Sequence, residues 1–421
     1  KNEVTKNFET SEIDFIIQQT SNDKYLKSNK IKTSIVDESD VLENSFNLNL
    51  YSNKLSINLN TTIYENLNKN KSDRFEFIFP RIKLTKNFEE ISKFNGNFTL
   101  NSETNIRQYN TNIIEKENIN DLIFNSNRTI NKFGFLNNHQ LLFRNANREN
   151  KNSNYKNKKN FYLSSIYQFN SILPMINEGT TYQNILKPRV SLKFAPSHTV
   201  NQRSTEKKID TTNIYSLNRI TNNSSTEGGV SLIYGMDYSL SQKLDNRELF
   251  NIKLANNIRL EENNNISNIN QMDEKISNLF NEIQYNYNEN LSIKYSSAIK
   301  NNLKDIEYES FKSNLNFKNF ISEFDYINEN NTFDKNSYIS NKSILNLNKF
   351  NSVEFNTRKN KTKDLTEYYN MIYRYKNDCL AASVEFNKDF YSDKELKPET
   401  SLFFKLTIIP FGEISGPDII Q

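Results

Sequence analysis

The stretch EIQYNYNENLSIKYS, residues 282–296, contains the pattern on which the fold prediction depends. Before the polar turn Asn288-Glu289-Asn290, isoleucine and tyrosine alternate with polar residues. After the turn, Leu291, Ile293 and Tyr295 alternate with serine and lysine. Side chains of a strand point alternately to opposite faces, so each run has one apolar and one polar face. The stretch is therefore predicted to be a β-hairpin.

The same pattern repeats through the last third of the chain. Short polar turns recur at Lys318-Asn319, Lys349-Phe350-Asn351 and Asn377-Asp378. The opposite ends of these hairpins, at 300–305, 328–336, 358–366 and 388–398, are longer and more charged. Strands of ~10 residues with short turns at one rim and long loops at the other are typical of outer-membrane β-barrels, and ten tilted residues can cross the hydrocarbon layer. We predict an all-β fold, a large antiparallel transmembrane β-barrel of ~20 to 26 strands. A large soluble antiparallel β-protein is the alternative.

The alternation assigns individual side chains to the two faces of this barrel. The apolar positions expected to face lipid are Leu291, Ile293, Val353, Phe355, Leu380 and Val384. The polar positions expected to face the lumen are Lys294, Glu354, Arg374 and Glu385.

Composition fits a barrel better than the competing classes. The 421 residues are 35% hydrophobic with a mean hydropathy of −0.77, which is explained if only alternate strand residues face lipid. The 30 Phe and 22 Tyr argue against a disordered chain, and with no Trp an aromatic girdle would consist of Tyr and Phe. The net charge of +4 gives no reason to expect a nucleic-acid partner. No apolar run is long enough for a membrane-spanning helix.

The organisation along the chain is expected to be that of one unit. The chain begins at Lys1 without a start Met or signal peptide, so residues 1–421 are expected to be a fragment that forms an outer-membrane barrel domain. Polar tracts are then loops within this domain. Residues 144–159 are expected to be an exposed loop, and residues 202–225 a loop that folds over or into the lumen.

Sites for chemistry are not apparent in the sequence. The two histidines, His139 and His198, have no partners at the spacing of a zinc site, and Cys379 is the only cysteine. No nucleophile with an adjacent base can be identified. The segment Glu227-Gly228-Gly229 lacks the glycine spacing and the lysine of a phosphate loop, so its glycines are expected to serve backbone packing or a bulge at the start of a strand. The sequence therefore predicts neither an enzyme nor a cofactor.

Three stretches resemble a known family. They are LKPRVSLKFAPS at 186–197, SLNRITNNSSTEGGVSLIYGMDYSL at 216–240, and YYNMIYRYKNDCLAASVEFNKDFYSDKELKPETSLFFKLTIIPFG at 368–412. Together they resemble the barrel domain of the LptD family, the lipopolysaccharide-assembly proteins of the Gram-negative cell outer membrane, in its alphaproteobacterial form. The resemblance implies that lipopolysaccharide passes through the barrel lumen and leaves by a lateral gate between the first and last strands.

The resemblance also implies partners and a disulfide. Members of the family are plugged by a lipoprotein, LptE, and receive lipopolysaccharide from a periplasmic Lpt bridge through a β-jellyroll domain. By comparison with the family, that domain and the first barrel strands are expected to be missing here. They join a cysteine at the place of Cys379 to the jellyroll side of the chain, so Cys379 is expected to form a disulfide with the missing N-terminal region. The remaining partners implied are lipopolysaccharide itself and outer-membrane lipid.

The last strand is predicted from residues 400–409 and would form one lip of that gate. Its residues are Thr400, Leu402, Phe404, Lys405, Leu406, Thr407 and Ile408, with the leucines, Phe404 and Ile408 toward lipid and with Lys405 and Thr407 toward the lumen. Pro410 is expected to end the strand, and Gly412 and Gly416 to release a tail. A general porin, a plugged uptake receptor or a surface adhesin would share every barrel argument, so these alternatives remain open at the level of sequence.

Overall fold

The computed structural model describes residues 8–28, 40–90, 92–152, 159–197, 199–200, 203, 207–220, 225–331, 335–390, 400–408 and 412–415. Within them, 23 strands form a single antiparallel sheet. The sequence prediction of a large all-β antiparallel fold is confirmed.

The sheet consists of strands of very different length. They are β1 (Thr10–Ile16), β2 (Val41–Tyr51), β3 (Leu55–Asn66), β4 (Phe75–Asn87), β5 (Gly96–Tyr109), β6 (Ile113–Ser126), β7 (Thr129–Ile130), β8 (Leu136–Lys151), β9 (Lys159–Ile172), β10 (Met175–Glu178), β11 (Tyr182–Ala195), β12 (Gly229–Gln242), β13 (Arg247–Arg259), β14 (Leu279–Asn288), β15 (Leu291–Ile299), β16 (Ile306–Phe317), β17 (Phe320–Asn330), β18 (Lys335–Asn346), β19 (Asn351–Asn360), β20 (Leu365–Lys376), β21 (Leu380–Asp389), β22 (Thr400–Ile408) and β23 (Gly412–Ser415). The helical elements are short: α1 (Tyr25–Ser28), η2 (Ser92–Phe94) and η3 (Ile269–Gln271). Among the described helices, none has the length and apolar character needed to span a bilayer.

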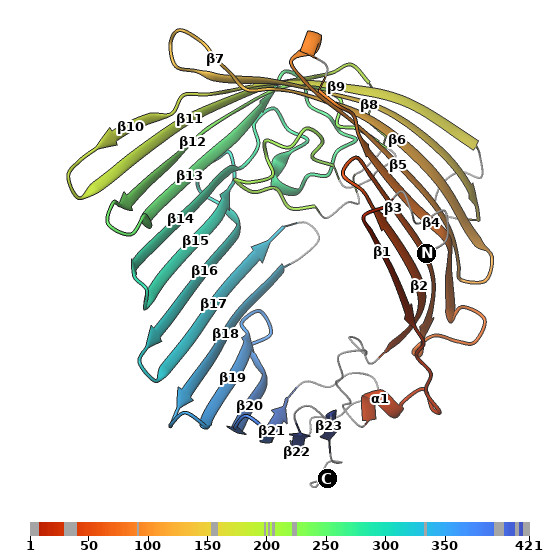
Figure 1. The fold of residues 1–421 in the computed structure, drawn as a ribbon, viewed down its shortest axis with the longest axis vertical. Coiled ribbons are helices and arrows are strands. Elements are labelled where there is room, and N and C mark those ends of the chain that lie inside the picture. Colours follow the sequence, from red (N-terminus) through yellow and green to blue (C-terminus); the bar gives the residue numbers. More distant parts are fainter. Residues whose placement is uncertain are drawn as a thin grey trace.

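Neighbouring strands in the sequence are neighbours in the sheet. The short strands β7 and β10 continue β6 and β9, because β7 pairs with β8 and β10 with β11, the same strands that β6 and β9 contact. The sheet curls around a lumen, so that the red N-terminal strands and the blue C-terminal strands approach each other (Figure 1). No strand ladder within the described residues joins β1 to β22 or β23. We call the region between these strands the seam.

The two faces of the sheet follow the alternation read from the sequence. On β9, Phe161 and Leu163 are 69% and 70% exposed, whereas Ile166 on the other face is fully buried. On β11, Phe194 is 52% exposed, and its neighbour Lys193 is 2% exposed. The exposed aromatic and aliphatic side chains thus cover the outside of the sheet, where a membrane barrel contacts lipid. On β9 and β11, the inner face is buried by other parts of the chain.

The turns agree with the sequence reading, but the loops are shorter than it suggested. Two-residue turns join β14 to β15 and β16 to β17, and three residues, Asn377 to Cys379, join β20 to β21. At the other rim, β18 begins at Lys335 and β20 at Leu365, inside the segments assigned to loops. These strands extend farther than the apolar alternation, because polar residues continue the backbone ladder beyond the apolar band.

Two sequence predictions are wrong. The described residues at both ends of the predicted loop 144–159 lie in strands: β8 runs to Lys151, β9 begins at Lys159, and Arg144 is a buried residue in the middle of β8. The dense Asn, Lys and Arg content obscured a strand whose inner face meets polar partners. Residues 400–408 do form a strand, β22, but it is not the last one. Gly412 is not part of a tail, since β23 begins there and pairs with the Lys405–Ile408 half of β22.

Candidate functional site

Two segments of the chain leave the wall of the barrel and fold into its interior. They are the described residues of 196–228, between β11 and β12, and residues 260–278, between β13 and β14. Figure 1 shows both lying inside the ring of strands, against the wall formed by β8 to β15. We call them together the lumenal insert. The expectation that residues 202–225 fold into the lumen is confirmed for the residues that the structure describes.

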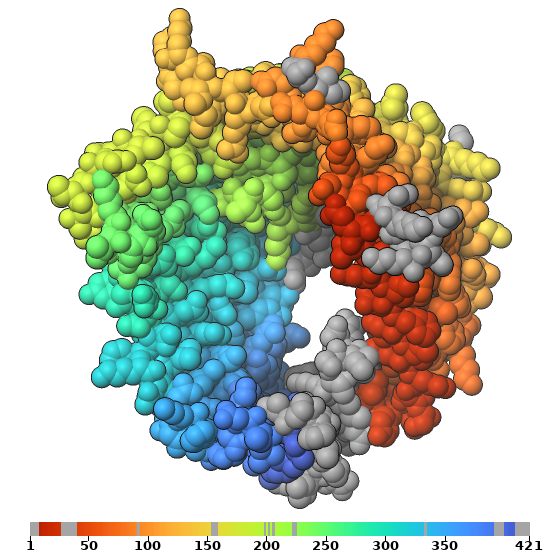
Figure 2. Space-filling model, viewed as in Figure 1, coloured from red at the N-terminus to blue at the C-terminus, as the bar shows by residue number. Residues whose placement is uncertain are grey.

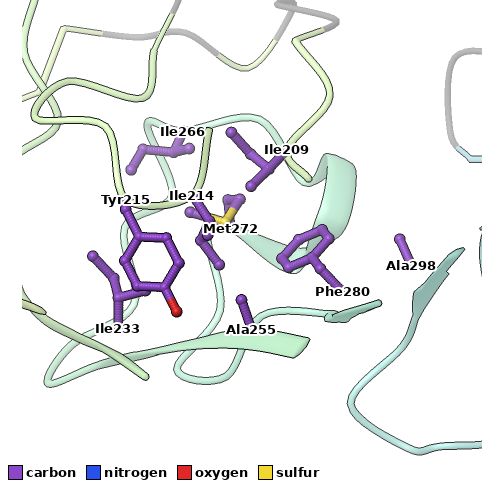
Figure 3. Packing of buried hydrophobic residues seen from close by; sticks show 9 residues of the cluster. All are labelled: Ile209, Ile214, Tyr215, Ile233, Ala255, Ile266, Met272, Phe280 and Ala298. Carbon is purple, nitrogen blue, oxygen red and sulfur yellow. The ribbon is translucent and has the colours of Figure 1, made fainter. Parts of the chain in front are cut away.

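An apolar core joins the insert to the wall. From the insert it contains Ile209, Ile214, Tyr215, Ile266 and Met272, and from the wall Ile233, Ala255, Phe280 and Ala298, all 9% exposed or less (Figure 3). A lumen that only held water would favour polar side chains at these wall positions. The wall is therefore built to receive an apolar surface on β12 to β15.

Tyr215 of the insert packs closely against Gly235 on β12. Its hydroxyl group lies where a side chain at Gly235 on β12 would stand, so only glycine leaves room for it. The Arg189 guanidinium lies over its ring, 4.0 Å from the centroid, an arrangement that is attractive because the ring face is electron-rich. Burial raises the pKa of the Tyr215 hydroxyl to about 12. Tyr215 is thus held as a neutral, packed side chain.

Four charged side chains meet at the junction of insert and wall. Glu227 of the insert accepts hydrogen bonds from Arg219 Nε at 2.7 Å and from Arg259 Nη1 at 2.6 Å. The Lys193 ammonium lies 3.6 Å from the same carboxylate, and Arg219 also donates to Asn257 Oδ1 at 2.9 Å. The four charged side chains are only 1–2% exposed. Two of the cations, Lys193 and Arg259, belong to the wall, so the carboxylate ties the insert to two strands.

The electrostatics of this cluster favour an ionised carboxylate. Burial by itself would raise the pKa of Glu227, but the charge of Arg219, followed by those of the wall cations, holds that pKa well below its ordinary value. Nearby, burial lowers the pKa of Lys207, which with Arg219 and Glu227 lines a cavity of about 20 Å³. That volume is on the order of one water molecule. The cluster is therefore a buried structural junction beside a small cavity.

Polar groups of the wall also bind the main chain of the insert. Arg144 Nη1 donates to the Ser225 carbonyl at 3.0 Å, and Gln168 Nε2 donates to that of Tyr215 at 2.8 Å. Lys193 Nζ donates to the Ser216 carbonyl, also at 2.8 Å. A buried carbonyl without a donor would be costly, and here strands β8, β9 and β11 supply the donors.

Residues 260–278 are held in the same way. Their last residues run along β13, where Ser277 N donates to the Asn257 carbonyl at 3.0 Å, and Asn256 Nδ2 donates to the carbonyls of Ser277 and Asn278. The buried Glu307 carboxylate on β16 accepts from Asn270 N at 2.8 Å and from Asn278 Nδ2 at 2.7 Å. Both segments are therefore fixed to the wall by buried hydrogen bonds.

The glycines before β12 have the structural role expected from the sequence. Gly229 has a φ of +98°, which side chains other than glycine rarely adopt, and a Cβ there would also lie 2.9 Å from Arg259 Nη2. A side chain at Gly228 would collide with the Ser197 carbonyl. Packing at the start of a strand is confirmed, and it allows Glu227 to reach the cations.

A recess of about 270 Å³ lies where the insert meets β14 to β16. Lys208 and Asp210 line it from the insert, and Glu282, Lys294 and Lys312 line it from the strands. Lys294 and Lys253 each lie 2.8 Å from the Glu282 carboxylate. These charges neutralise one another, so the recess is a polar surface of the lumen without a strong net charge.

The other side chains assigned to the lumen lie on the opposite part of the wall. Glu354 on β19 forms an ion pair with Arg374 on β20, and Glu385 on β21 accepts a hydrogen bond of 2.7 Å from Asn370. The Glu354 side chain is buried, whereas that of Arg374 is 45% exposed. Their part in substrate passage remains a prediction.

Cys379 and the predicted gate strand lie near the C-terminal end of the described chain. Cys379 is an exposed free thiol in the β20–β21 turn, with its backbone N–H donating to Asn377 Oδ1 at 3.0 Å. On β22, Phe404 and Ile408 are 46% and 41% exposed. The residues pair with β21 along the whole strand, from Thr400 to Ile408.

Sequence reasoning missed the charge cluster, because its four members come from two strands and two loop positions. The segment Glu227-Gly228-Gly229 was considered only as a possible phosphate loop, so the role of the Glu227 carboxylate was missed. A usable signal was present: Ile209, Ile214, Tyr215 and Leu217 stand in a tract that otherwise reads as polar loop. His139 is exposed and lies beside Tyr167, and His198 is outside the described residues. In the described part of the chain, no group of three or more His, Cys, Asp or Glu side chains could hold a metal ion.

Comparison with known families decides the identity of this barrel. The family model "LptD: LPS transport system D" matches residues 3–363. The chain belongs to the LptD family. The LptD family is a transport family, so the protein is a component of lipopolysaccharide transport in the outer membrane, with lipopolysaccharide as its substrate and the Lpt system as its partner.

Solved structures similar to this LptD-family chain are other barrels. The siderophore receptor PirA from Acinetobacter baumannii shares 9% identity over 88% of this chain and 72% of its own, with a TM-score of 0.41. A point mutant of the ferric enterobactin receptor PfeA from Pseudomonas aeruginosa shares 8% over 94% and 72%, also at 0.41. A mutant porin of Rh. blastica shares 8% over 70% and 95%, at 0.30. Such values do not distinguish one kind of barrel from another. No curated protein sequence matches significantly.

Proposed function

We propose that this barrel passes the glycan of lipopolysaccharide through its lumen and releases the molecule sideways at the seam. The family membership supports this route, and within the described residues no strand ladder joins β1 to β22 or β23. Unpaired backbone groups in hydrocarbon cost several kcal/mol each. The seam, where the described residues form no strand ladder, is therefore the part of the barrel wall that we propose opens.

A cysteine lock across the seam tests the route. Ser401 of β22 is combined in turn with Thr10, Glu12 or Asp14 of β1, in the full-length protein, and the pair that crosslinks is used. The matched control joins Glu12 to Asn49, which are register partners within the β1–β2 ladder. We expect the seam lock to stop the appearance of new lipopolysaccharide at the cell surface, and the control lock to leave it unchanged. Delivery that continues with the seam fully crosslinked would contradict a lateral exit and favour a route through the lumen alone.

We further propose that Cys379 forms a disulfide with sequence N-terminal to the barrel. Its exposed thiol lies in one of the short turns, which in outer-membrane barrels face the periplasm. The periplasm is an oxidising compartment in which exposed thiols are converted to disulfides. Non-reducing electrophoresis of the full-length protein should show a faster band than that of Cys379→Ser. Equal mobility of the two proteins would argue against the bond.

The partners that support this function are a plug lipoprotein of the LptE type and the periplasmic Lpt bridge, the latter through a jellyroll domain upstream of the barrel. The family membership supports both. Affinity purification of the full-length protein from its own membranes, followed by mass spectrometry, tests for them. A barrel that purifies without a lipoprotein would contradict the first assignment, and one without any bridge component would contradict the second.

A further inference from the structure

We propose that the lumenal insert is a built-in plug that stays in place while the barrel works, so that material crosses only through the other half of the lumen, beside the seam. The fixed plug is inferred from contacts within this chain. Only its relation to lipopolysaccharide rests on the function proposed above.

The first argument is the cost of moving the insert. Displacement would separate Glu227 from Lys193 and Arg259, which would leave two wall cations, each 1% exposed, without their carboxylate. Hydrogen bonds between ionised groups are stronger than those between neutral groups, so separating these partners is costly even where water can reach the wall afterwards. Displacement would also expose the apolar side chains of Ile233 and Phe280 to the water of the lumen.

The second argument is that the insert has no free end within the described residues. Its first segment continues directly into β12 at Gly229, and its second segment runs from β13 at Arg259 to β14 at Leu279. The segments are also bound to each other, because Asn263 Nδ2 donates to Thr199 Oγ1 at 2.9 Å and Arg203 donates to the Asn264 carbonyl. These contacts hold the described residues of both segments to the wall and to each other, which favours an insert that stays in place.

The third argument is that the half of the lumen beside the seam is open and its charged side chains are exposed. Figure 2 shows the opening through the molecule between the red N-terminal strands and the blue C-terminal strands, with the green insert to one side of it. The inward cations there remain hydrated: Arg81, Arg358 and Arg374 are 40%, 42% and 45% exposed although each is paired with a glutamate. A wet, charged wall suits the polar glycan of a large lipid, and the closed junction around Glu227 does not.

A crosslink that fixes the insert to the wall tests whether it moves. Leu217 of the insert packs against the cluster that contains Ala195 of β11. Cysteines at these two positions, with Cys379 left in place, are joined by a short bismaleimide in the full-length protein, and the crosslinked peptide is quantified by mass spectrometry. We expect delivery of lipopolysaccharide to the cell surface to be unchanged at nearly complete crosslinking. A fall in delivery in proportion to the crosslinked fraction would overturn the fixed plug. If the unmodified protein restored no delivery, the proposed function would fail instead.

Release of the insert gives an independent readout. In Glu227→Gln, the wall cations lose their counter-charge and the insert should open more often. We expect a several-fold increase in the uptake of a large hydrophilic antibiotic, seen as a several-fold lower inhibitory concentration. The control Glu89→Gln removes an exposed ion pair with Lys54 and should change nothing. A folded Glu227→Gln barrel, verified by its heat-dependent shift on gels, with unchanged uptake would overturn the proposal. If this variant does not fold, Ile214→Ala is used instead, because it weakens only the apolar contact. Increased antibiotic uptake is again expected, and unchanged uptake in the folded variant would overturn the proposal.

Discussion

The lumen wall has two halves that use the same residue types in different ways. On the half that carries the insert, Lys193 and Arg259 are 1% exposed and share one carboxylate. On the half beside the seam, Arg358 and Arg374 are 42% and 45% exposed, and each has its own glutamate. Losing a partner in the first setting costs about 3–5 kcal/mol, whereas an exposed pair contributes about 0–1 kcal/mol. The same alternation of polar side chains thus builds a structural junction on one side and a hydrated surface on the other.

This difference shows that a polar inner face does not by itself indicate a water-filled passage. What distinguishes the halves is the neighbour that each face meets. The first meets folded chain, with the apolar side chains of Ile209 and Ile214 and with main-chain carbonyls that need donors. The second meets open lumen. The predictions below test how far this distinction holds.

The largest effect is expected when the buried cluster loses its carboxylate, and a smaller one when it loses one of its cations. Glu227→Gln should reduce the free energy of opening the insert by about 3–5 kcal/mol, because it leaves three buried cations without a carboxylate. Lys193→Met should cost much less, since it removes one of three cations and leaves Arg219 and Arg259 paired with Glu227. Hydrogen exchange of the amides of residues 207–220, in the folded barrel, measures both. Equal losses of protection would show that the charge balance is not what holds the insert.

The apolar contact should give the next largest effect. Ile214 is fully buried between the insert and the wall, so Ile214→Ala should cost about 2–4 kcal/mol through lost burial and the cavity that remains. The matched control is Ile130→Ala on β7, where the side chain is 73% exposed. The same exchange experiment should register a change only for the first. An insert that opens no more readily in Ile214→Ala would mean that its apolar core is not tightly packed.

Lowering the pH from neutral to about 4.5 should weaken the Glu227 junction less than the two substitutions above. The folded-state pKa of Glu227 lies well below its ordinary value of 4.5, so its contribution is fully present above about pH 4.5 and is lost only as the pH falls toward the folded-state value. The charged groups that face it are Lys193, Arg219, Arg259 and the nearby Lys207. Conductance of the reconstituted barrel should therefore remain unchanged from neutral pH to about 4.5 in the wild type. An increase of conductance already between pH 7 and 5, absent from Glu227→Gln, would contradict a lowered pKa.

Much of the fold could be predicted from the sequence, because local alternation dictates it. The hairpin at 282–296, the turn before Cys379 and the position of β22 all follow from period-two patterns and turn residues. Predictions failed where polar residues occupy a strand with polar neighbours, as Arg144 does beside Asp121. Residue type then no longer reports whether a segment is exposed.

The insert junction could not be predicted for a different reason. Lys193, Arg219, Glu227 and Arg259 meet only after the sheet has curled and both segments have folded inward, and no local spacing encodes that meeting. Likewise β23 was missed, because four residues with two of them Gly and Ser carry no alternation that a sequence reading can detect. The gate, the disulfide of Cys379 and the upstream domain remain predictions.

The smallest effect should come from the same chemical change made on the seam half. Glu354→Gln removes the charge that Arg374 contacts, but the Arg374 side chain is 45% exposed and can be hydrated in place. The amide can still accept the hydrogen bond that Asn356 Nδ2 donates to the side chain at 2.8 Å. We therefore expect a loss of about 1 kcal/mol or less in the unfolding free energy, as for exposed pairs. Hydrogen exchange of β19 and β20 amides, compared with that of residues 207–220 in Glu227→Gln, measures the contrast directly. Losses of similar size at the two sites would mean that the seam half is as dry as the plugged half, and the division of the lumen into a closed and an open side would have to be abandoned.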